Sequence, residues 1–554
     1  MPRPALASRE GYDAVVVGGA LAGAAAALLL ARKRPSARIL VVEPQTAFPR
    51  KVGEATVETS AYFLRSVLGL GGHLDLEQLP KHGLRYWFSD DGKSDGGERR
   101  RFAELSEVAP RALADVPTFQ LDRSRLDEAV LAAAAAAGCE VLRGSRVAAW
   151  EEGWPRCTVT IEAASDTGGE AGGEEGGEAG GVSASGAGAG AGGAARTVTT
   201  RWLIDGSGRH AFVARRKRLL ERTEEHPVAA LWGRWNGVAD LDDPAFLAAH
   251  GLPASGEVRR RLATNHFCGY GWWCWVIPLA DGATSVGLVH HRELFAPAGE
   301  TAEQRYRRFV SSRPGLAELV AGAELADFHA YRHLPYASGR YAGRGWALVG
   351  DAASFLDPYY SPGLDHLAMS VFASVELVAD DLEARDDGRL DAALDMHNEH
   401  FRRSYPRWLD ALYLGKYELL GDAELTACAY MVDTAFYYMG IVTPLYRHPQ
   451  SLANPAFGLA SPQSEYAWRT MRTFNRRMNR IARFRRATGV YGRRNLGWRR
   501  LGPAPGLGRK ILPMLASGLW LWLRLEAGML LGRLRHGRRD LSRPVPAFDV
   551  AGRV

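Results

Sequence analysis

The chain has 554 residues, 46% of them hydrophobic and 24% charged, with a formal net charge of +7. This is the composition of an ordinary globular protein, and the length exceeds what one hydrophobic core organises, so we expect two or three subdomains. The five cysteines (Cys139, Cys157, Cys268, Cys274 and Cys428) are odd in number and form no C-x-x-C pair, which argues against a disulfide framework or a metal site and favours a reducing cytoplasm.

The first elements predict a strand–helix–strand unit. No apolar core or cleavage pattern of a signal peptide precedes them, which also fits a cytoplasmic protein. Residues 12–17 are an apolar, β-branched run, residues 22–32 an alanine- and leucine-rich helix, and residues 38–42 a second strand. This order, with glycines between strand and helix, is typical of a dinucleotide-binding βαβ unit.

The turn inside this unit carries the residues that would hold a dinucleotide. Gly18 permits a tight turn and Gly23 permits close packing of helix on strand, while Ala20 stands where the usual pattern has glycine. The helix N-terminus then offers free N–H groups to a pyrophosphate. Glu43 follows about 20 residues later, as a carboxylate that binds ribose would. The alternative is a glycine-rich turn without a ligand.

The middle of the chain predicts one strong helix and several strands. Residues 126–137 predict the helix, and residues 140–142 a strand behind it. Residues 158–161 and 197–204 predict the two arms of a hairpin. Between them, residues 168–195 are almost entirely Gly, Ala, Glu and Ser and bury too little apolar surface to offset their ordering entropy, so we expect a disordered insert without chemistry.

The second half predicts a sheet followed by helices. Strands are expected within residues 231–238, 271–289 and 346–349. From Leu367 onward the pattern is mainly helical, with breaks expected at three prolines, Pro444, Pro449 and Pro455.

Two C-terminal features bear on partners. The apolar run 511–523 is too short to span a bilayer and predicts a packed helix or, alternatively, a helix on a membrane surface. Many arginines lie between Arg472 and Arg500, which indicates either a solvated helix face or a docking patch for an acidic carrier protein or anionic lipid. No recognition motif for nucleic acid accompanies this charge, so we expect no nucleic-acid partner.

Three further segments resemble those of glutathione-reductase-type flavoproteins, in the order of their hydroxybenzoate-hydroxylase-like branch. Residues 203–209 resemble the strand-to-turn segment beside the dinucleotide and include Asp205. Residues 348–353 resemble the second FAD fingerprint, in which Gly350 and Asp351 would hold ribitol and pyrophosphate. Residues 120–127 resemble the helix-entry segment, with Arg123 near the cofactor. Together with the first glycine turn, this resemblance, over roughly residues 10 to 400, implies FAD as the cofactor.

Within that branch, three segments resemble the flavin-dependent halogenases. Trp273-x-Trp275-x-Ile277-Pro278 is similar to their W-x-W-x-I-P signature. Residues 52–56 match the G-E-A/S-T loop near the flavin, and residues 357–363 resemble the loop against the flavin ring where halide binds. The chain is closer to the phenol and pyrrole halogenases that act on carrier-bound substrates than to those of free tryptophan.

The resemblance implies a chemistry and a set of site residues. In that family, reduced FAD supplied by a separate reductase gives a hydroperoxide, halide attacks it to form hypohalous acid, and a lysine carries the halogen to an aromatic ring. Trp273 and Trp275 would line the dry passage between flavin and substrate. Halide would bind at Ser361, Gly363 and Leu364. The remaining residues expected at the cofactor are Lys51, Gly53, Glu54, Ala55, Thr56, Pro358, Gly363 and Leu364.

The lysine is the least determined of these residues. Lys81 precedes a Gly-x-x-aromatic strand, as the lysine of carrier-dependent halogenases does. The alternative is an exposed lysine at the start of a strand. In the tryptophan halogenases the lysine lies within that strand, where this chain has Arg85, which stays protonated and is a poor halogen carrier. Lys51 is a second candidate, although its place before Gly53 suggests a flavin contact.

The predicted halide loop departs from the family pattern. Tryptophan halogenases have Ser-Thr-Gly after a catalytic glutamate, whereas here Ser361-Pro362-Gly363 follows Tyr360. Pro362 has no N–H to offer an anion. Asp365 and His366 could supply acid–base chemistry or cap the next helix. This departure makes phenolic, pyrrolic or carrier-tethered substrates more consistent with the sequence than free tryptophan.

These observations predict an α/β protein with a Rossmann-like FAD domain, a β-sheet substrate domain and a C-terminal helical region. The FAD domain is expected in three parts, 1–80, 120–225 and 341–400, the substrate domain in two, 81–119 and 226–340, and the helical region over 401–554. The predicted function is installation of chlorine or bromine on an electron-rich aromatic substrate in secondary metabolism. Alternatives are a flavin monooxygenase or polyprenyl or polyene reductase, and a non-catalytic flavin-binding partner of a biosynthetic assembly. Peripheral membrane contact through the C-terminal region is a further expectation.

Overall fold

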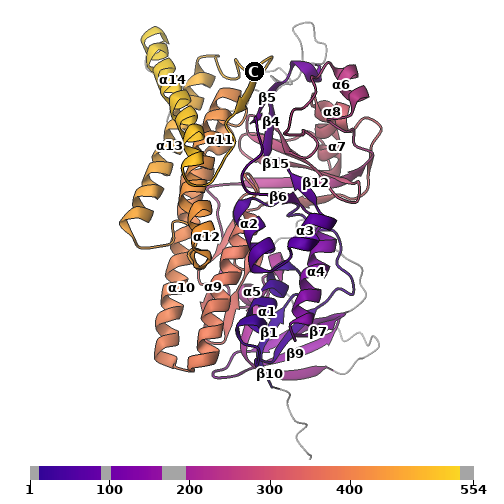
Figure 1. Cartoon of the computed structure of the whole chain (residues 1–554), viewed down its shortest axis with the longest axis vertical. Coiled ribbons are helices and arrows are strands. Elements are labelled where there is room, and N and C mark those ends of the chain that lie inside the picture. The colour runs from indigo at the N-terminus through magenta and orange to yellow at the C-terminus, as the bar shows by residue number, and fades with distance from the viewer. Residues whose placement is uncertain (1–10, 89–100, 165–194, 537–554) are drawn as a thin grey trace, which may run out of the picture.

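Two β-sheets, one above the other, are covered along one side by long helices (Figure 1). The computed structural model describes residues 11–88, 101–164 and 195–536. The N-terminal elements form the lower half of Figure 1, the second sheet lies in the upper right, and the C-terminal helices run along the left side. Residues 168–194 of the predicted insert lie outside the described residues.

The lower sheet has the predicted dinucleotide-binding topology, with order β19-β20-β10-β1-β2-β7. The central strand β1 is parallel to β2 and to β10, and β9 pairs with β10 as the predicted hairpin. The strands of this sheet are β1 (Gly11–Val17), β2 (Ile39–Glu43), β7 (Glu140–Arg143), β8 (Ser145–Glu151), β9 (Cys157–Ala163), β10 (Arg196–Asp205), β19 (Ala342–Gly343) and β20 (Trp346–Leu348).

Three helices cover one face of this sheet and form a common core with it: α1 (Leu21–Lys33), α4 (Arg123–Ala136) and α9 (Gly363–Ala384). The alanine-rich sequence of α1 lets it lie close to its neighbours, and eleven consecutive residues from Leu21 to Ala31 are buried. A helix that is apolar on every side in this way is a core helix.

The upper sheet has order β16-β12-β15-β14-β13-β4-β5-β22, with β17 also paired to β12. The tryptophan-rich strand β14 lies between β13 and β15, in the interior of the sheet. Its strands are β4 (Leu84–Phe88), β5 (Ser106–Pro110), β12 (Val228–Asn236), β13 (Thr264–Gly269), β14 (Trp272–Pro278), β15 (Thr284–His291), β16 (Glu324–Leu325), β17 (His329–Tyr331) and β22 (Arg499–Gly502).

Short elements connect the two sheets. Strands β3 (Leu79–Lys81) and β6 (Thr118–Gln120) pair with each other, next to α2 (Glu58–Tyr62) and α3 (Gly71–Glu77). The remaining short elements are α5 (Phe212–Arg216), β11 (Leu220–Arg222), α6 (Pro244–His250), α7 (Ala302–Ser312), α8 (Leu316–Leu319), β18 (Tyr336–Ser338) and β21 (Ser354–Phe355).

The C-terminal region is mainly helical, with two corrections to the sequence analysis. Its helices are α10 (Asp387–Trp408), α11 (Ala423–Tyr437), α12 (Thr443–Arg447), α13 (Pro462–Ala487) and α14 (Leu512–His536). Pro444 does not break a helix, because α12 directly continues the π-helical segment Tyr438–Val442, and Ala423–Arg447 runs as one helical stretch. The region also adds strand β22 to the upper sheet, parallel to β5.

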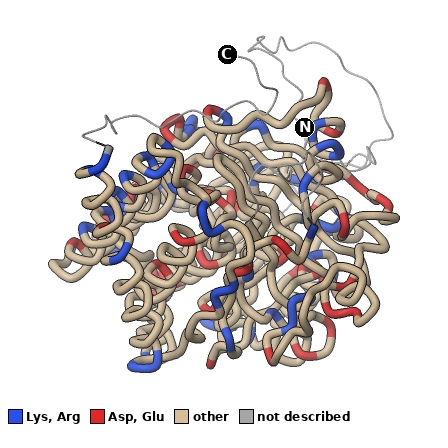
Figure 2. The backbone as a smooth tube through the Cα atoms, turned by 90° about the horizontal axis from the view of Figure 1, so that it is seen from above, with Lys and Arg blue, Asp and Glu red and all other residues tan. Residues whose placement is uncertain are grey.

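The arginines between 472 and 500 mainly hold the C-terminal helices in place. Arg485 is buried and bridges Asp422 and Glu424, with Nη1 and Nη2 each 2.9 Å from a carboxylate oxygen. Further pairs are Arg472 and Arg476 with Asp410, Arg477 with Glu526, Arg483 with Glu418, and Arg493 with Glu424. Lys and Arg are interleaved with Asp and Glu (Figure 2). For the buried Arg485, these contacts contradict both sequence-based interpretations, a solvated face and an acidic docking patch, whereas Arg476 and Arg493 keep 60% and 53% of their side chains exposed.

Substitution Arg485→Met should destabilise the protein, because Asp422 and Glu424 would keep their buried charges without this partner. We expect the free energy of unfolding to fall by about 3–5 kcal/mol in urea denaturation. The control is Arg480→Met on the same helix, whose side chain is exposed and which should change stability by less than about 0.5 kcal/mol. Equal effects of the two substitutions would contradict the structural role of Arg485.

Candidate active site

The nucleotide end of the site is built by three glycines that pack backbone against backbone. Gly18 has φ +87°, and a Cβ there would lie 2.8 Å from the carbonyl oxygen of Gly206. A Cβ on Gly23 would lie 1.9 Å from the carbonyl oxygen of Gly18. Only glycine fits these positions, so α1 begins directly against the ends of β1 and β10. Ala20 is the N-cap and makes no side-chain capping bond, which leaves first-turn N–H groups for a phosphate.

Glu43 is fixed above this turn at the end of β2. Its Oε2 accepts a hydrogen bond from the Gly19 N–H at 2.6 Å, and its Oε1 accepts one from the Gln45 N–H at 2.8 Å. The carboxylate is therefore oriented by the backbone beside the N-terminus of α1, in the place that ribose recognition requires.

Two carboxylates expected at the cofactor make contacts within the fold. Asp205 accepts hydrogen bonds from Ser207 and from the Val213 N–H, which ties the end of β10 to α5. Glu54 is buried and accepts a hydrogen bond from Nε of Arg234 at 3.0 Å, which joins the 52–56 loop to β12 of the upper sheet. Both side chains hold the backbone of segments that are expected near the cofactor, and their carboxylates contact protein groups.

The remaining expected cofactor residues gather around the start of α1. A Cβ on Gly350 would lie 3.0 Å from Ala22, which places the 350–352 turn and Asp351 against α1. Burial raises the pKa of Asp351, while Arg209 and Arg123 oppose this shift. Arg123 also donates to the carbonyl of Val52 at 3.2 Å, next to Gly53. These groups can hold the two ends of one dinucleotide.

Lys51 and Ala55 flank this loop. Lys51 is half-buried, with Nζ 5.2 Å from the ring centroid of Phe48. Ala55 forms a backbone bridge with Gln120 and so links the loop to β6.

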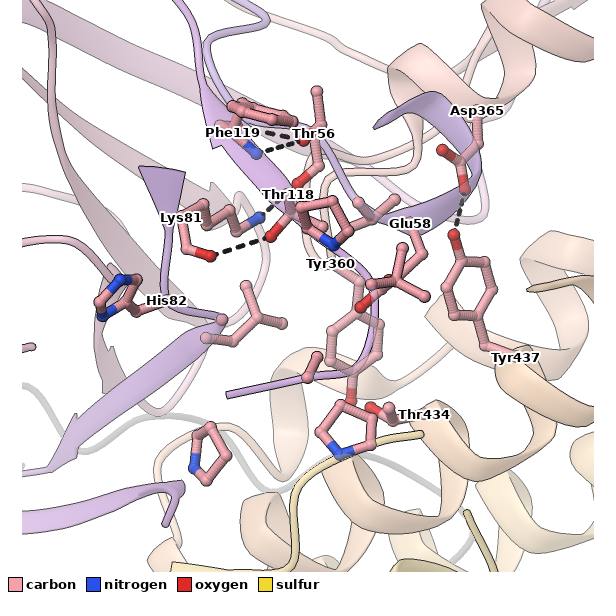
Figure 3. Close-up of a pocket in the computed structure, with 18 of the residues that line it drawn as sticks. Thr56, Glu58, Lys81, His82, Thr118, Phe119, Tyr360, Asp365, Thr434 and Tyr437 are labelled. Carbon is pink, nitrogen blue, oxygen red and sulfur yellow. Dashed lines mark hydrogen bonds between the residues drawn. The ribbon is translucent and has the colours of Figure 1, made fainter. Parts of the chain in front are cut away.

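Next to this cradle lies a cavity of about 450 Å³. It is enclosed by the 56–58 segment, β3, the 110–119 segment, the start of α9, and α11 (Figure 3). Its lining is largely apolar and aromatic, with Trp408, Tyr413, Tyr430 and Tyr437 among the rings. Lys81, Glu58 and Asp365 are the charged groups of this cavity that interact with one another.

Lys81 is buried at the end of β3, and its Nζ donates to the carbonyl oxygen of Thr56 at 2.7 Å (Figure 3). The strand is held by β6, where the Thr118 hydroxyl donates to the Lys81 carbonyl at 3.0 Å. Burial lowers the pKa of Lys81 to about 8, although Glu58 and Asp365 act in the opposite direction. The alternative of an exposed lysine at a strand start is therefore wrong.

Asp365 and Glu58 approach Lys81 from two different helices. Asp365, in the first turn of α9, accepts hydrogen bonds from the Ser60 N–H at 2.9 Å and the Tyr437 hydroxyl at 2.8 Å. Burial raises its pKa to about 7. Glu58, the first residue of α2, accepts a hydrogen bond from Tyr438 at 2.7 Å, and burial raises its pKa as well. Asp365 can therefore exchange a proton near neutral pH.

His366, the other acid–base candidate, does not line the cavity. It is buried, its ring lies 5.1 Å from that of Trp408, and its Nε2 has no hydrogen-bond partner among the described residues. Burial lowers its pKa to about 4, so it is a neutral packing residue. Neither residue caps α9, whose N-cap is Pro362.

The predicted halide loop has two sides. Tyr360 and Pro362 line the cavity, whereas Ser361, Gly363 and Leu364 do not. Tyr360 and Ser361 have positive φ values of 72° and 58°, which turn the chain sharply before α9. The amides of Gly363 and Leu364 belong to the first turn of that helix, where N–H groups lack intrahelical acceptors and favour an anion. The loop thus separates a potential anion site from the Lys81 cavity.

Pro358 and Asp357 anchor this loop. The Pro358 carbonyl accepts from the Ser361 N–H at 2.8 Å. Asp357 is buried and accepts from His226, Tyr417 and the Tyr359 N–H, each at 2.8 Å.

Trp273 and Trp275 lie one layer behind the cavity and do not line it, and their expected place along the passage between flavin and substrate stays a prediction. Trp273 donates to Tyr417 and Trp275 to Ser285, each at 3.0 Å, so both indoles are fixed. The ring of Trp273 lies 5.4 Å from that of Tyr359, which lies 4.2 Å from the cavity-lining ring of Tyr360. The two tryptophans therefore pack behind the tyrosines, and Tyr360 is the ring that faces the cavity.

A second buried lysine, Lys416, was not found from the sequence. Its Nζ lies 2.7 Å from Asp433, which also accepts from the Tyr360 hydroxyl at 2.9 Å. In the sequence, its burial is indicated by its position inside the largely apolar run 412–420. Glu58 was also missed, although it follows the 52–56 loop by two residues. Lys416 is used in an ion pair, whereas Lys81 bonds a neutral carbonyl.

Comparisons with known proteins agree with this geometry. A family model described as tryptophan halogenase matches residues 13–93. The flavin-dependent halogenase chlA of Dictyostelium discoideum is 27% identical, over 66% of this chain and 60% of that protein. The tryptophan 2-halogenase of Chondromyces crocatus is 28% identical, over 71% of this chain and 66% of the relative. The chain thus spans less than two thirds of the length of these two relatives.

The fold is shared with solved halogenases. The structure of halogenase PltM in complex with phloroglucinol and FAD superposes with a TM-score of 0.66 and 16% identity, covering 93% of this chain and 96% of that one. The three-glycine cradle, the oriented Glu43 and the open first turn of α1 fit FAD as the cofactor. In sequence and in fold, the chain is similar to flavin-dependent halogenases.

Proposed function

We propose that this protein halogenates an electron-rich aromatic ring and that the amine of Lys81 carries the halogen. The observation that carries the proposal is a buried lysine with a pKa of about 8 beside a largely apolar, aromatic cavity. A fall in pKa from 10.5 to about 8 raises the neutral fraction at pH 7 roughly 300-fold. Only the neutral amine has the lone pair that an electrophilic halogen requires.

Bound FAD, reduced by a separate flavin reductase, would supply hypohalous acid from oxygen and halide. The Lys81 nitrogen then takes the halogen from the acid, so that the N–halogen bond forms and the oxygen–halogen bond breaks. The leaving hydroxide takes one proton and departs as water, and the ammonium nitrogen loses one proton. In the second step the aromatic carbon takes the halogen, the ring loses a proton, and the nitrogen regains one.

Asp365 and Glu58 are suited to move these protons. Asp365 has a pKa of about 7, so comparable amounts of acid and base are present at neutral pH. Its hydrogen bonds from Ser60 and Tyr437 hold it at the cavity surface. We assign it the donor role toward the leaving hydroxide and the acceptor role toward the ring proton. These two residues replace the glutamate that is absent before Ser361.

The cavity supports a phenolic or pyrrolic substrate, free or carrier-tethered. Its largely apolar lining suits a flat ring, and the hydroxyls of Tyr360 and Tyr437 are already used by Asp433 and Asp365. Such a lining offers stacking to a flat, neutral aromatic ring. The phenolic compound in the PltM complex is consistent with this class.

Lys81→Met should abolish halogen transfer while leaving flavin chemistry intact. With a flavin reductase, oxygen and bromide or chloride, we expect the halogenated product to fall at least about 100-fold by mass spectrometry. Oxidation of reduced FAD should stay within about twofold of the wild type. The control Lys217→Met removes a surface lysine paired with Glu152 and should retain the product. A hydroxylated product without halogen in the wild type would instead identify a monooxygenase.

The rate of halogen transfer should rise with pH through about 8, because Lys81 loses its proton there. Glu58 raises the pKa of Lys81, so Glu58→Gln should lower that pKa and move the rising limb to lower pH. The measurement is the initial rate of substrate halogenation against pH with hypohalite supplied directly. The control is Glu77→Gln at the exposed end of α3. A limb that moves to higher pH in Glu58→Gln would show that Lys81 is not the titrating group.

A further inference from the structure

We propose that the outer face of α14 binds an anionic lipid bilayer surface and holds the protein there with its cavity entrance close to the membrane. α14 forms the outer edge of the helical side (Figure 1). It belongs to an apolar helical stretch, Gly508–Arg535. Only 28% of the most apolar 18-residue part of this stretch is buried in the protein. The other such stretch, Ala423–Arg447, is 67% buried and serves as a core helix.

The exposed residues of α14 form one continuous apolar stripe. Its large members are Leu512, Leu519, Trp520, Leu523, Leu530, Leu531 and Leu534, with exposures from 37% at Leu519 to 84% at Leu534. Their separations of three, four and seven residues, with Trp520 and Leu531 directly after Leu519 and Leu530, place them on one side of the helix. From 512 to 534 the stripe is about 35 Å long. The opposite side packs into the protein through Met514, Leu521, Leu525 and Met529, so the helix lies along the molecule.

The charges of this helix fit anionic lipid. The exposed charged residues within the described part of α14 are Arg524 and Arg535, both cationic. The acidic residue Glu526 is turned inward, where it pairs with Arg477 and accepts from Trp522 at 3.1 Å. The Arg524 guanidinium lies 4.7 Å from the ring of Trp520. Leucine, tryptophan and arginine side by side suit a helix at the boundary of headgroups and acyl chains.

A second copy of the chain fits this face less well. Arg524 lies at the middle of the 512–534 stripe. Two stripes related by a two-fold axis in antiparallel packing would therefore bring two Arg524 side chains together at the axis. Like charges at that point oppose association, whereas lipid phosphates favour it.

Part of the exposed lining of the cavity lies near the start of this helix. The 112–117 segment and Pro505 line the cavity, and Leu113 there is 40% exposed. Asp115 in that segment forms an ion pair with Lys510, two residues before α14, at 3.0 Å. A membrane bound along α14 would therefore lie near the path by which an apolar ring enters.

Vesicle flotation of the full chain loaded with FAD tests the proposal. We expect binding to phosphatidylcholine vesicles that contain about 30 mol % phosphatidylglycerol and weaker binding to pure phosphatidylcholine. Leu523→Glu combined with Leu531→Glu should reduce binding at least about tenfold while the flavin absorbance spectrum stays unchanged. The matched control is Leu76→Glu, which alters an 85% exposed leucine outside the stripe and should bind as the wild type does.

Three outcomes would overturn the proposal. One is failure of the wild type to bind the anionic vesicles. The second is equal loss of binding in Leu76→Glu. The third is a wild-type dimer in light scattering that dissociates on Leu523→Glu with Leu531→Glu, which would assign the stripe to a second copy. Halogenation of a soluble phenol by the doubly substituted variant should equal that of the wild type, so the result does not depend on the proposed activity.

Discussion

The burial of the Lys81 amine against a neutral carbonyl is the interaction on which the rest of this site depends. Thr56 supplies that carbonyl, and Glu58 and Asp365 supply negative charge without a direct hydrogen bond to the amine. Lys416, the other buried lysine, instead lies in a direct ion pair with Asp433. Burial favours loss of the proton from the Lys81 amine, and the negative charge of Glu58 and Asp365 favours its return.

Maintaining that environment requires elements from distant parts of the chain. The Ser60 N–H that holds Asp365 is 305 positions away in sequence, and Tyr437 comes from α11. The C-terminal helices close the cavity through Trp408, Tyr413 and Tyr430. Their arginine pairs with Asp410, Glu418, Asp422, Glu424 and Glu526 fix these helices to one another. The helical region is therefore part of the active site.

The features that could be predicted from the sequence are those encoded locally. The βαβ unit, its glycine turn, Glu43 and the placement of Lys81 before an aromatic strand depend on short spacings, and the structure has them where expected. The residues that were missed or misplaced depend on tertiary packing. Nothing near Glu58 in the sequence shows that Tyr438 and Lys81 face it, and nothing near Trp273 shows that Tyr359 and Tyr360 stand in front.

Because halogen transfer requires an unprotonated amine, the most direct measurement is the pKa of the Lys81 side chain in the FAD-loaded protein. Selective isotope labelling of lysine, with assignment from the Lys81→Arg spectrum, gives this value by NMR titration. We expect a pKa of about 8, because the amine is buried. A value near the usual 10.5 would contradict it, because the amine would then be almost entirely protonated at neutral pH.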